Sequence, residues 1–273
     1  MKKLIIPFDG GNFSKGAISF ANDLHSIKPL LLTGVFLPAV DYARLFFFPT
    51  AFSAPAYIPV AEGFEEDDVE RSVEQFAQYC QKNQIEYRVH KDLYDSAIPQ
   101  LTKETRFADL MVIGSETFYK SGITYGSNEY LKDALHQTEC PVIVVPEEFN
   151  FPAHIILAYD GSASSVFAIK QFAQLFPELC NRKTILVYAG DEKHTIPDQV
   201  LIEELAARHF RDLTITKINT DDKKEIYNWF YLNRNSIVVS GSFGRSGISE
   251  LFRRSFMMEL IKEYCTPVFI AHQ

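Results

Sequence analysis

The chain has 273 residues, 47% of them hydrophobic and 23% charged, which is the composition of a globular protein with one or two domains and a sizeable core. Acidic residues outnumber basic ones by 35 to 27, so the net charge is −8, and no basic run is long enough to follow a phosphate backbone. We therefore expect no nucleic-acid partner.

Cysteine usage and apolar stretches bear on the compartment. The four cysteines form no CxxC pair, and we expect them to be reduced and buried. The first apolar run ends at Asp9, which is too early for a signal peptide, and the longest uncharged stretch, 45–61, contains three prolines, which exclude a membrane helix. The sequence predicts a cytoplasmic protein without membrane contact.

Short apolar runs alternate with helical periodicities through the first half of the chain. The runs are continuous in apolar residues, as is typical of parallel strands covered on both faces. The predicted elements are a strand at 3–8, a helix at 14–25, a strand at 30–37, a helix at 65–83, a strand at 85–90, a helix at 96–107, a strand at 110–113, a helix at 128–136 and a strand at 141–145.

An aromatic and proline-rich stretch at about 41–63 interrupts this alternation. One interpretation is a long loop whose aromatic side chains pack on their own domain. A second is a flap that covers a ligand or binds a partner, because exposed apolar patches mark contact surfaces. Membrane contact is a remote third.

The second half repeats the alternation of strand and helix. Its predicted elements are a strand at 154–159, a helix at 164–176, a strand at 184–188, a helix at 197–210, a strand at 213–218, a helix at 223–232, a strand at 237–240, a helix ending at 264 and a strand at 267–271.

The two halves can be laid on each other, which indicates a duplication. PFDGGNFSKGAISFA aligns with AYDGSASSVFAIKQFA, so that Asp9 lies on Asp160 and Ser14 on Ser165. The first half is longer by about the length of the aromatic stretch. We predict two tandem domains, 1–148 and 152–273.

Five strands separated by helical crossovers in each half predict an α/β protein with two doubly wound five-stranded parallel sheets of the Rossmann-like class. Such sheets bind ligands at the carboxyl ends of their strands, where the strand order reverses. The turns at Asp160–Gly161 and at 241–247 both follow predicted strands, so we expect them to face each other across one crevice.

The turn at 241–247, GSFGRSG, is the principal candidate site. Gly241, Gly244 and Gly247 permit a ligand to approach the backbone at a helix N-terminus, where N–H groups bind anions. Arg245 is placed to pair with phosphate oxygens, and Ser246 or Ser255 to donate a hydroxyl. The alternative is a tight strand-to-helix turn in which the glycines serve geometry alone.

The other polar residues are less informative. Asp9 and Asp160 follow buried strands, where an aspartate either accepts hydrogen bonds from a ligand or caps the next turn. The seven histidines show no metal-ligand spacing, and no nucleophile elbow occurs. No catalytic arrangement is visible, so we expect a binding protein rather than an enzyme.

Each half resembles a universal stress protein (UspA-type) domain. The marks are the turn formed by Asp160, Gly161 and Ser162 with Ser165 behind it, the GSxGRSG sequence after the fourth strand, and the last Pro-Val strand. The resemblance implies an adenine nucleotide alpha hydrolase-like fold and a site for ATP or another adenine nucleotide, with Mg only where ATP is bound. It places Asp160 on the adenosine side, Gly241 and Gly244 on the first two glycines of the family loop, and Ser255 in its last hydroxyl position.

The sequence departs from the family pattern at Arg254, which replaces the last glycine of the loop. In the first half, Thr117 replaces the second glycine, and Gly126–Ser127 arrives one residue early. We therefore expect at most one nucleotide site, in the second half.

The resemblance also implies pairing through the last strands. Val142 to Val145 would then lie antiparallel to Val268 to Ala271 and close the sheet edges, and a homodimer is a further option. The function that it implies is a regulatory or ligand-sensing module. The alternatives are a nucleotide-free interaction protein of the same fold and a slow ATPase.

Overall fold

The structure is a computed structural model of the whole chain. It describes residues 1–9, 13–37, 46–48, 56–58, 66–91, 97–115, 135, 137–190, 195–220, 222–241, 260 and 266–271.

The chain divides into two compact units, Met1–Cys140 and Pro141–Gln273. The described strands of the first unit form a parallel sheet in the order β6-β1-β2-β5. Its elements are β1 (Lys2–Asp9), α1 (Lys15–Ile27), β2 (Leu30–Leu37), α2 (Glu66–Lys82), β5 (Glu86–Lys91), α3 (Ala97–Arg106) and β6 (Leu110–Gly114).

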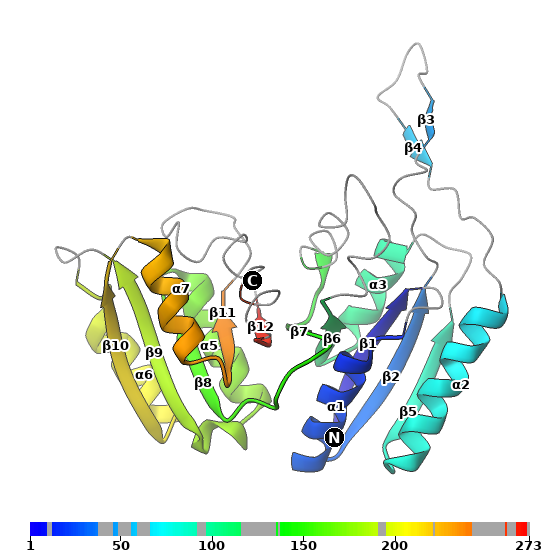
Figure 1. Ribbon diagram of the computed structural model, residues 1–273, viewed down its shortest axis with the longest axis horizontal. Coiled ribbons are helices and arrows are strands. Elements are labelled where there is room, and N and C mark those ends of the chain that lie inside the picture. The colour runs from blue at the N-terminus through cyan, green and yellow to red at the C-terminus, as the bar shows by residue number, and fades with distance from the viewer. Residues whose placement is uncertain are drawn as a thin grey trace. The chain divides into compact units, whose positions relative to one another are not determined.

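The second unit has five parallel strands in the order β10-β9-β8-β11-β12. Helices α5 and α6 cover one face of this sheet and α7 covers the other (Figure 1). The elements are β7 (Val142–Val145), β8 (His154–Ala158), α5 (Ala163–Leu175), a 3₁₀ turn η2 (Leu179–Asn181), β9 (Lys183–Gly190), α6 (Gln199–His209), β10 (Asp212–Asn219), α7 (Lys223–Leu232), β11 (Ser236–Ser240) and β12 (Val268–Ile270).

The strand order identifies where each sheet reverses direction. In the second unit β8 lies between β9 and β11. Strand β9 is the next strand in the chain after β8, and β11 follows β9 after two further crossovers. In the first unit β1 lies between β2 and β6 in the same way. The expected α/β class with doubly wound parallel strands is confirmed, and the carboxyl ends of β8 and β11 are where such sheets bind ligands.

Strand β7 pairs with β12 in the antiparallel direction, with Val144 opposite Val268 and Val142 opposite Ile270. The predicted antiparallel pairing of these two strands is confirmed. All four residues of β7 are buried, and its contacts group it with the second unit. The chain therefore passes from one unit to the other before β7.

Aromatic side chains fill much of the described core. In the second unit, Phe172 of α5 is fully buried and packs edge-on against Phe269 of β12, with ring centroids 5.3 Å apart. In the first unit, the rings of Phe13 and Phe36 stack on Phe8, at 5.3 and 4.8 Å. The rings at the end of β1 thus form a solid cluster.

The described cysteines are buried, as predicted. Cys80, Cys140 and Cys180 are free thiols. Burial raises the pKa of the Cys80 and Cys140 thiols to about 12 and that of Cys180 to about 11, because a thiolate is poorly solvated there. These three side chains are packing groups rather than nucleophiles, and Cys265 lies outside the described residues.

The aromatic stretch contains two short strands that were not predicted. A loop was expected throughout 41–63, but Phe46–Phe48 (β3) and Ala56–Ile58 (β4) form a short antiparallel hairpin. Three aromatic residues in succession favour extended backbone, although the prolines around them indicate a loop. The predicted helix at 128–136 and the one ending at 264 fall almost entirely outside the described residues.

Candidate functional site

The candidate site lies at the carboxyl ends of β8 and β11. In the register of these neighbouring strands, Ile237 lies opposite Ile155 and Val239 lies opposite Leu157. Continued by two residues, this register places Gly241 opposite the first residue after β8. The turn after β8 contains Asp160 and Gly161. The two predicted turns therefore leave the sheet side by side.

Asp160 shapes the turn that leads into α5. The N–H of Ser162 donates to Asp160 Oδ1 at 2.9 Å, and the N–H of Ser165 donates to Ser162 Oγ at 3.1 Å, which makes Ser162 the N-cap. The Ser165 hydroxyl donates to the Ser162 carbonyl at 2.8 Å. One carboxylate oxygen of Asp160 thus has a structural role, and among the described residues no donor reaches the other, Oδ2.

Gly161 has a conformation that requires glycine. Its φ is +79°, in the left-handed region, and a Cβ there would lie 2.8 Å from Pro197 Cβ. This turn is therefore held tightly against the residues that precede α6.

Gly241 permits the end of β11 to lie close against the backbone of α5. A Cβ on this residue would lie 2.6 Å from the carbonyl carbon of Ser164 and 2.7 Å from the backbone nitrogen of Ser165. The end of β11 therefore abuts the first turn of α5 directly. Because backbone N–H groups at a helix N-terminus favour anions, this contact places the start of the 241–247 turn beside a positive dipole end.

Tyr159 was not predicted as a site residue, although it immediately precedes Asp160. Its side chain is buried, and its hydroxyl donates to the carbonyl of Pro197 at 2.9 Å. Burial raises the pKa of this phenol, and the nearby carboxylates of Asp198 and Asp160 raise it further. The hydroxyl is therefore a neutral hydrogen-bond donor at physiological pH.

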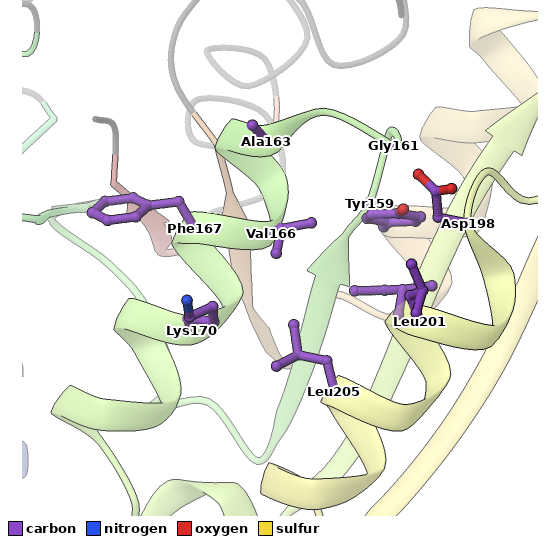
Figure 2. A pocket seen from close by; sticks show the side chains of 10 residues that line it. Tyr159, Gly161, Ala163, Val166, Phe167, Lys170, Asp198, Leu201 and Leu205 are labelled. Carbon is purple, nitrogen blue, oxygen red and sulfur yellow. The ribbon is translucent and has the colours of Figure 1, made fainter.

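A groove between α5 and α6 was also not predicted (Figure 2). Its volume is about 490 Å³, which is typical of small-molecule sites. Helical periodicity identifies the apolar faces of both helices but not the distance between them, so the sequence carried no signal for this groove. The lining residues are Tyr159, Gly161, Ala163, Val166, Phe167, Lys170, Asp198, Leu201, Ile202 and Leu205.

Several predicted site residues lie outside the described part of the chain. The remainder of the loop lies outside the described residues, as do Arg254 and the first-half positions 117, 126 and 127. The structure therefore brings together three of the predicted residues, Asp160, Gly161 and Gly241. The loop residues that lie outside are Gly244, Arg245, Ser246, Gly247 and Ser255.

In the described part of the chain, no three His, Cys, Asp or Glu side chains lie together in a group that would hold a metal ion. Nor does that part contain a helix of the length and apolarity needed to cross a membrane.

No protein-family model and no curated protein sequence matches the chain. Similar folds occur among solved structures. A universal stress protein from Archaeoglobus fulgidus has a TM-score of 0.68 at 13% identity, and the match covers 100% of this chain and 96% of that one. A protein of unknown function from Pseudomonas aeruginosa has a TM-score of 0.55 at 11% identity, covering 100% of this chain and 92% of that one.

The cytoplasmic domain of a prokaryotic cation chloride cotransporter is also similar. Its TM-score is 0.53 at 7% identity, and the match covers 98% of this chain and 94% of that domain. The three matches extend over both units rather than over one sheet alone. The chain has the fold of a universal stress protein.

Proposed function

We propose that the chain is a universal stress protein that acts as a regulatory or ligand-sensing module and binds an adenine nucleotide in its second unit. The observation that carries the proposal is the direct contact between Gly241 and the first turn of α5, next to Asp160. This contact lies at the strand reversal, where folds of this class bind their ligands. The likeness to the Archaeoglobus fulgidus protein supports the family assignment.

In this proposal the phosphate chain binds to backbone N–H groups of residues 242–247. Arg245 pairs with phosphate oxygens, and the hydroxyls of Ser246 and Ser255 donate to them. Oδ2 of Asp160 accepts a hydrogen bond from the adenosine. Arg254 decides the affinity, because it either obstructs the phosphates or adds a cation. A Mg²⁺ ion accompanies the nucleotide only if that nucleotide is ATP.

The packing of the first unit supports the proposal that the chain has only one nucleotide site, in the second unit. Phe8 precedes Asp9 as Tyr159 precedes Asp160, and its ring is stacked between those of Phe13 and Phe36. Phe76 of α2 adds a fourth ring, edge-on to Phe8 at 5.7 Å. The region beside this strand end is therefore occupied by side chains, and we propose that the first unit is a scaffold.

The second candidate is a nucleotide-free interaction protein of the same fold. It is favoured by the structural roles of two of the site residues. Gly241 permits close packing and Asp160 Oδ1 caps a turn, so neither residue needs a ligand to explain its presence. A similar fold also forms the cytoplasmic domain of a prokaryotic cation chloride cotransporter, so the fold is not confined to universal stress proteins.

Calorimetric titration with ATP and with AMP tests the proposal. Asp160→Asn retains the Oδ1 acceptor of the turn but replaces Oδ2 by an amide donor. We expect this variant to bind at least about tenfold more weakly, since a hydrogen bond to a charged group contributes about 1.5–3 kcal/mol and each 1.4 kcal/mol is a factor of ten. Gly244→Val should abolish binding by obstructing the backbone cradle.

Asp222→Asn is the matched control. Asp222 caps α7 with the same geometry, its Oδ1 accepting from the N–H of Lys224 at 2.9 Å. This variant should bind like the wild type. Absence of heat from the wild type would refute the nucleotide site and leave the interaction protein, whereas equal weakening in both Asn variants would show that Asp160 acts only as a cap. Release of phosphate from ATP above background would support the slow ATPase.

A further inference from the structure

The groove between α5 and α6 lies on the face of the second sheet that these two helices cover, and it begins beside the turn at Asp160–Gly161, because Gly161 is one of its lining residues. We propose that this groove is a second binding site, for an elongated apolar molecule that carries one anionic group. The proposal goes beyond the nucleotide site and does not depend on it.

The walls of the groove are apolar and come from both helices. Val166 of α5 faces Leu201 and Leu205 of α6 across it, as Figure 2 shows. Leu201 is 65% exposed although it borders the groove, and its neighbour Val200 is 76% exposed. Large aliphatic side chains left in water next to a concave surface are the usual wall of a ligand site, because a bound apolar molecule would remove their surface from water.

The charged residues of the groove stand at its two ends. Lys170 lies seven residues, or about 10 Å, along α5 from Ala163, and Asp198 lies at the other end, beside Gly161 (Figure 2). The side chain of Lys170 is exposed, and among the described residues no carboxylate pairs with it. An anionic group at the Lys170 end is attracted there and remains remote from Asp198. The arrangement therefore favours a negatively charged ligand and orients it with its charged group at the Lys170 end of the groove.

The described residues of the first unit are packed differently beside the corresponding strand end. There the second crossover helix, α2, presents Phe76, whose fully buried ring contacts Phe8 and Phe36 at 5.7 and 6.1 Å. In the second unit α6 presents the smaller Ile202 to the groove. Tyr159, the residue aligned with Phe8, is among the lining residues of the groove and donates its hydroxyl to the carbonyl of Pro197, whereas Phe8 belongs to an aromatic stack.

The test uses decanoate and decylamine, which share an apolar chain and differ in the sign of the head group. Calorimetric titrations of the full chain are made without nucleotide and below the concentrations at which either probe forms micelles. We expect decanoate to bind with one molecule per chain, and decylamine to bind at least tenfold more weakly.

Two variants locate the site. Lys170→Gln should weaken decanoate binding about fivefold, the contribution of an exposed ion pair. Leu201→Glu should weaken it more than tenfold, because a carboxylate in the wall repels the ligand, and the exposure of Leu201 means that the fold tolerates the change. Their matched controls lie on α7, which covers the opposite face of the sheet: Lys224→Gln and Leu232→Glu, where Leu232 is 75% exposed.

The controls should bind decanoate like the wild type. The proposal is overturned if decanoate gives no heat with the wild type, if decylamine binds as tightly as decanoate, or if the α5 and α6 variants weaken binding no more than their α7 controls.

Discussion

Substituting Gly241 by alanine should disrupt the contact between β11 and α5. The new Cβ would lie 2.6 Å from the carbonyl carbon of Ser164, whereas ordinary contacts begin at 3.4 Å, so the two backbones must separate by about 0.8 Å (3.4 − 2.6). Inserting a methyl group into a packed site costs about 1–3 kcal/mol, and we expect the upper end because helix backbone cannot rotate aside. The free energy of unfolding should therefore fall by about 3 kcal/mol.

Gly190→Ala is the comparison within the same unit. Its Cβ would lie 3.0 Å from Cε1 of Tyr188, a shortfall of 0.4 Å (3.4 − 3.0) against a ring edge that is able to move. We expect a loss of about 1 kcal/mol, near the lower end of the range for inserted methyl groups.

Urea unfolding followed by the fluorescence of Trp229 measures both changes. This is the single tryptophan of the chain, and it lies on α7, so it reports on the second unit. At about 2 kcal/mol per M, the midpoint should fall by about 1.5 M for Gly241→Ala and by about 0.5 M for Gly190→Ala. Equal midpoints for the two variants would refute the view that Gly241 is needed for backbone contact.

Four further predictions concern the buried groups. Tyr159→Phe should lower the free energy of unfolding by about 1 kcal/mol, because the carbonyl of Pro197 loses its donor; an unchanged urea midpoint would show that water replaces it. Phe172→Ala should lower it by about 3–5 kcal/mol through the cavity left against Phe269, and a loss below 1 kcal/mol would mean that the core collapses around the gap. In a Cys265→Ser variant at pH 8, a thiol reagent should modify no cysteine until urea unfolds the chain. The raised pKa values of the three buried thiols also mean that unfolding releases protons at alkaline pH. The free energy of unfolding should therefore fall as pH rises from about 9, the ordinary thiol pKa, toward 11–12. A urea midpoint that stays constant from pH 8 to 11 would contradict this. The three thiols are Cys80, Cys140 and Cys180.

The regular elements were predictable because their signals are local. The helix predicted from Ser14 begins at Lys15 with Ser14 as its N-cap, since a serine before an apolar periodicity both starts the helix and satisfies its N–H groups. Strand 30–37 was predicted residue for residue, because an unbroken apolar run bounded by turns permits few alternatives. By contrast, the hairpin of β3 and β4 within 41–63 was not predicted. It depends on the pairing of residues about ten positions apart, such as Phe47 with Tyr57.

The candidate site was less predictable, because the same residue types serve folding and binding. Aspartate after a strand was expected either to cap a turn or to hold a ligand, and the structure shows that Asp160 performs the first role with one oxygen. Gly241 was expected either to belong to an anion cradle or to serve the geometry of a tight turn, and its distance to Ser164 gives it a packing role. The groove depends on how far apart two helices lie, which is a tertiary property that no local pattern records.

The antiparallel pairing of β7 with β12 has a consequence for the synthesis of the protein. Val144 pairs with Val268, which the ribosome adds 124 residues later (268 − 144). At about 5–20 residues per second, β7 emerges roughly 6–25 s before its partner exists. During that interval this apolar strand has an unpaired edge toward β12, which is the kind of edge at which nascent chains associate wrongly. A chaperone that shields residues 142–145 would therefore be needed most before the last strand is made, and a truncation just before residue 268 would leave that edge exposed permanently.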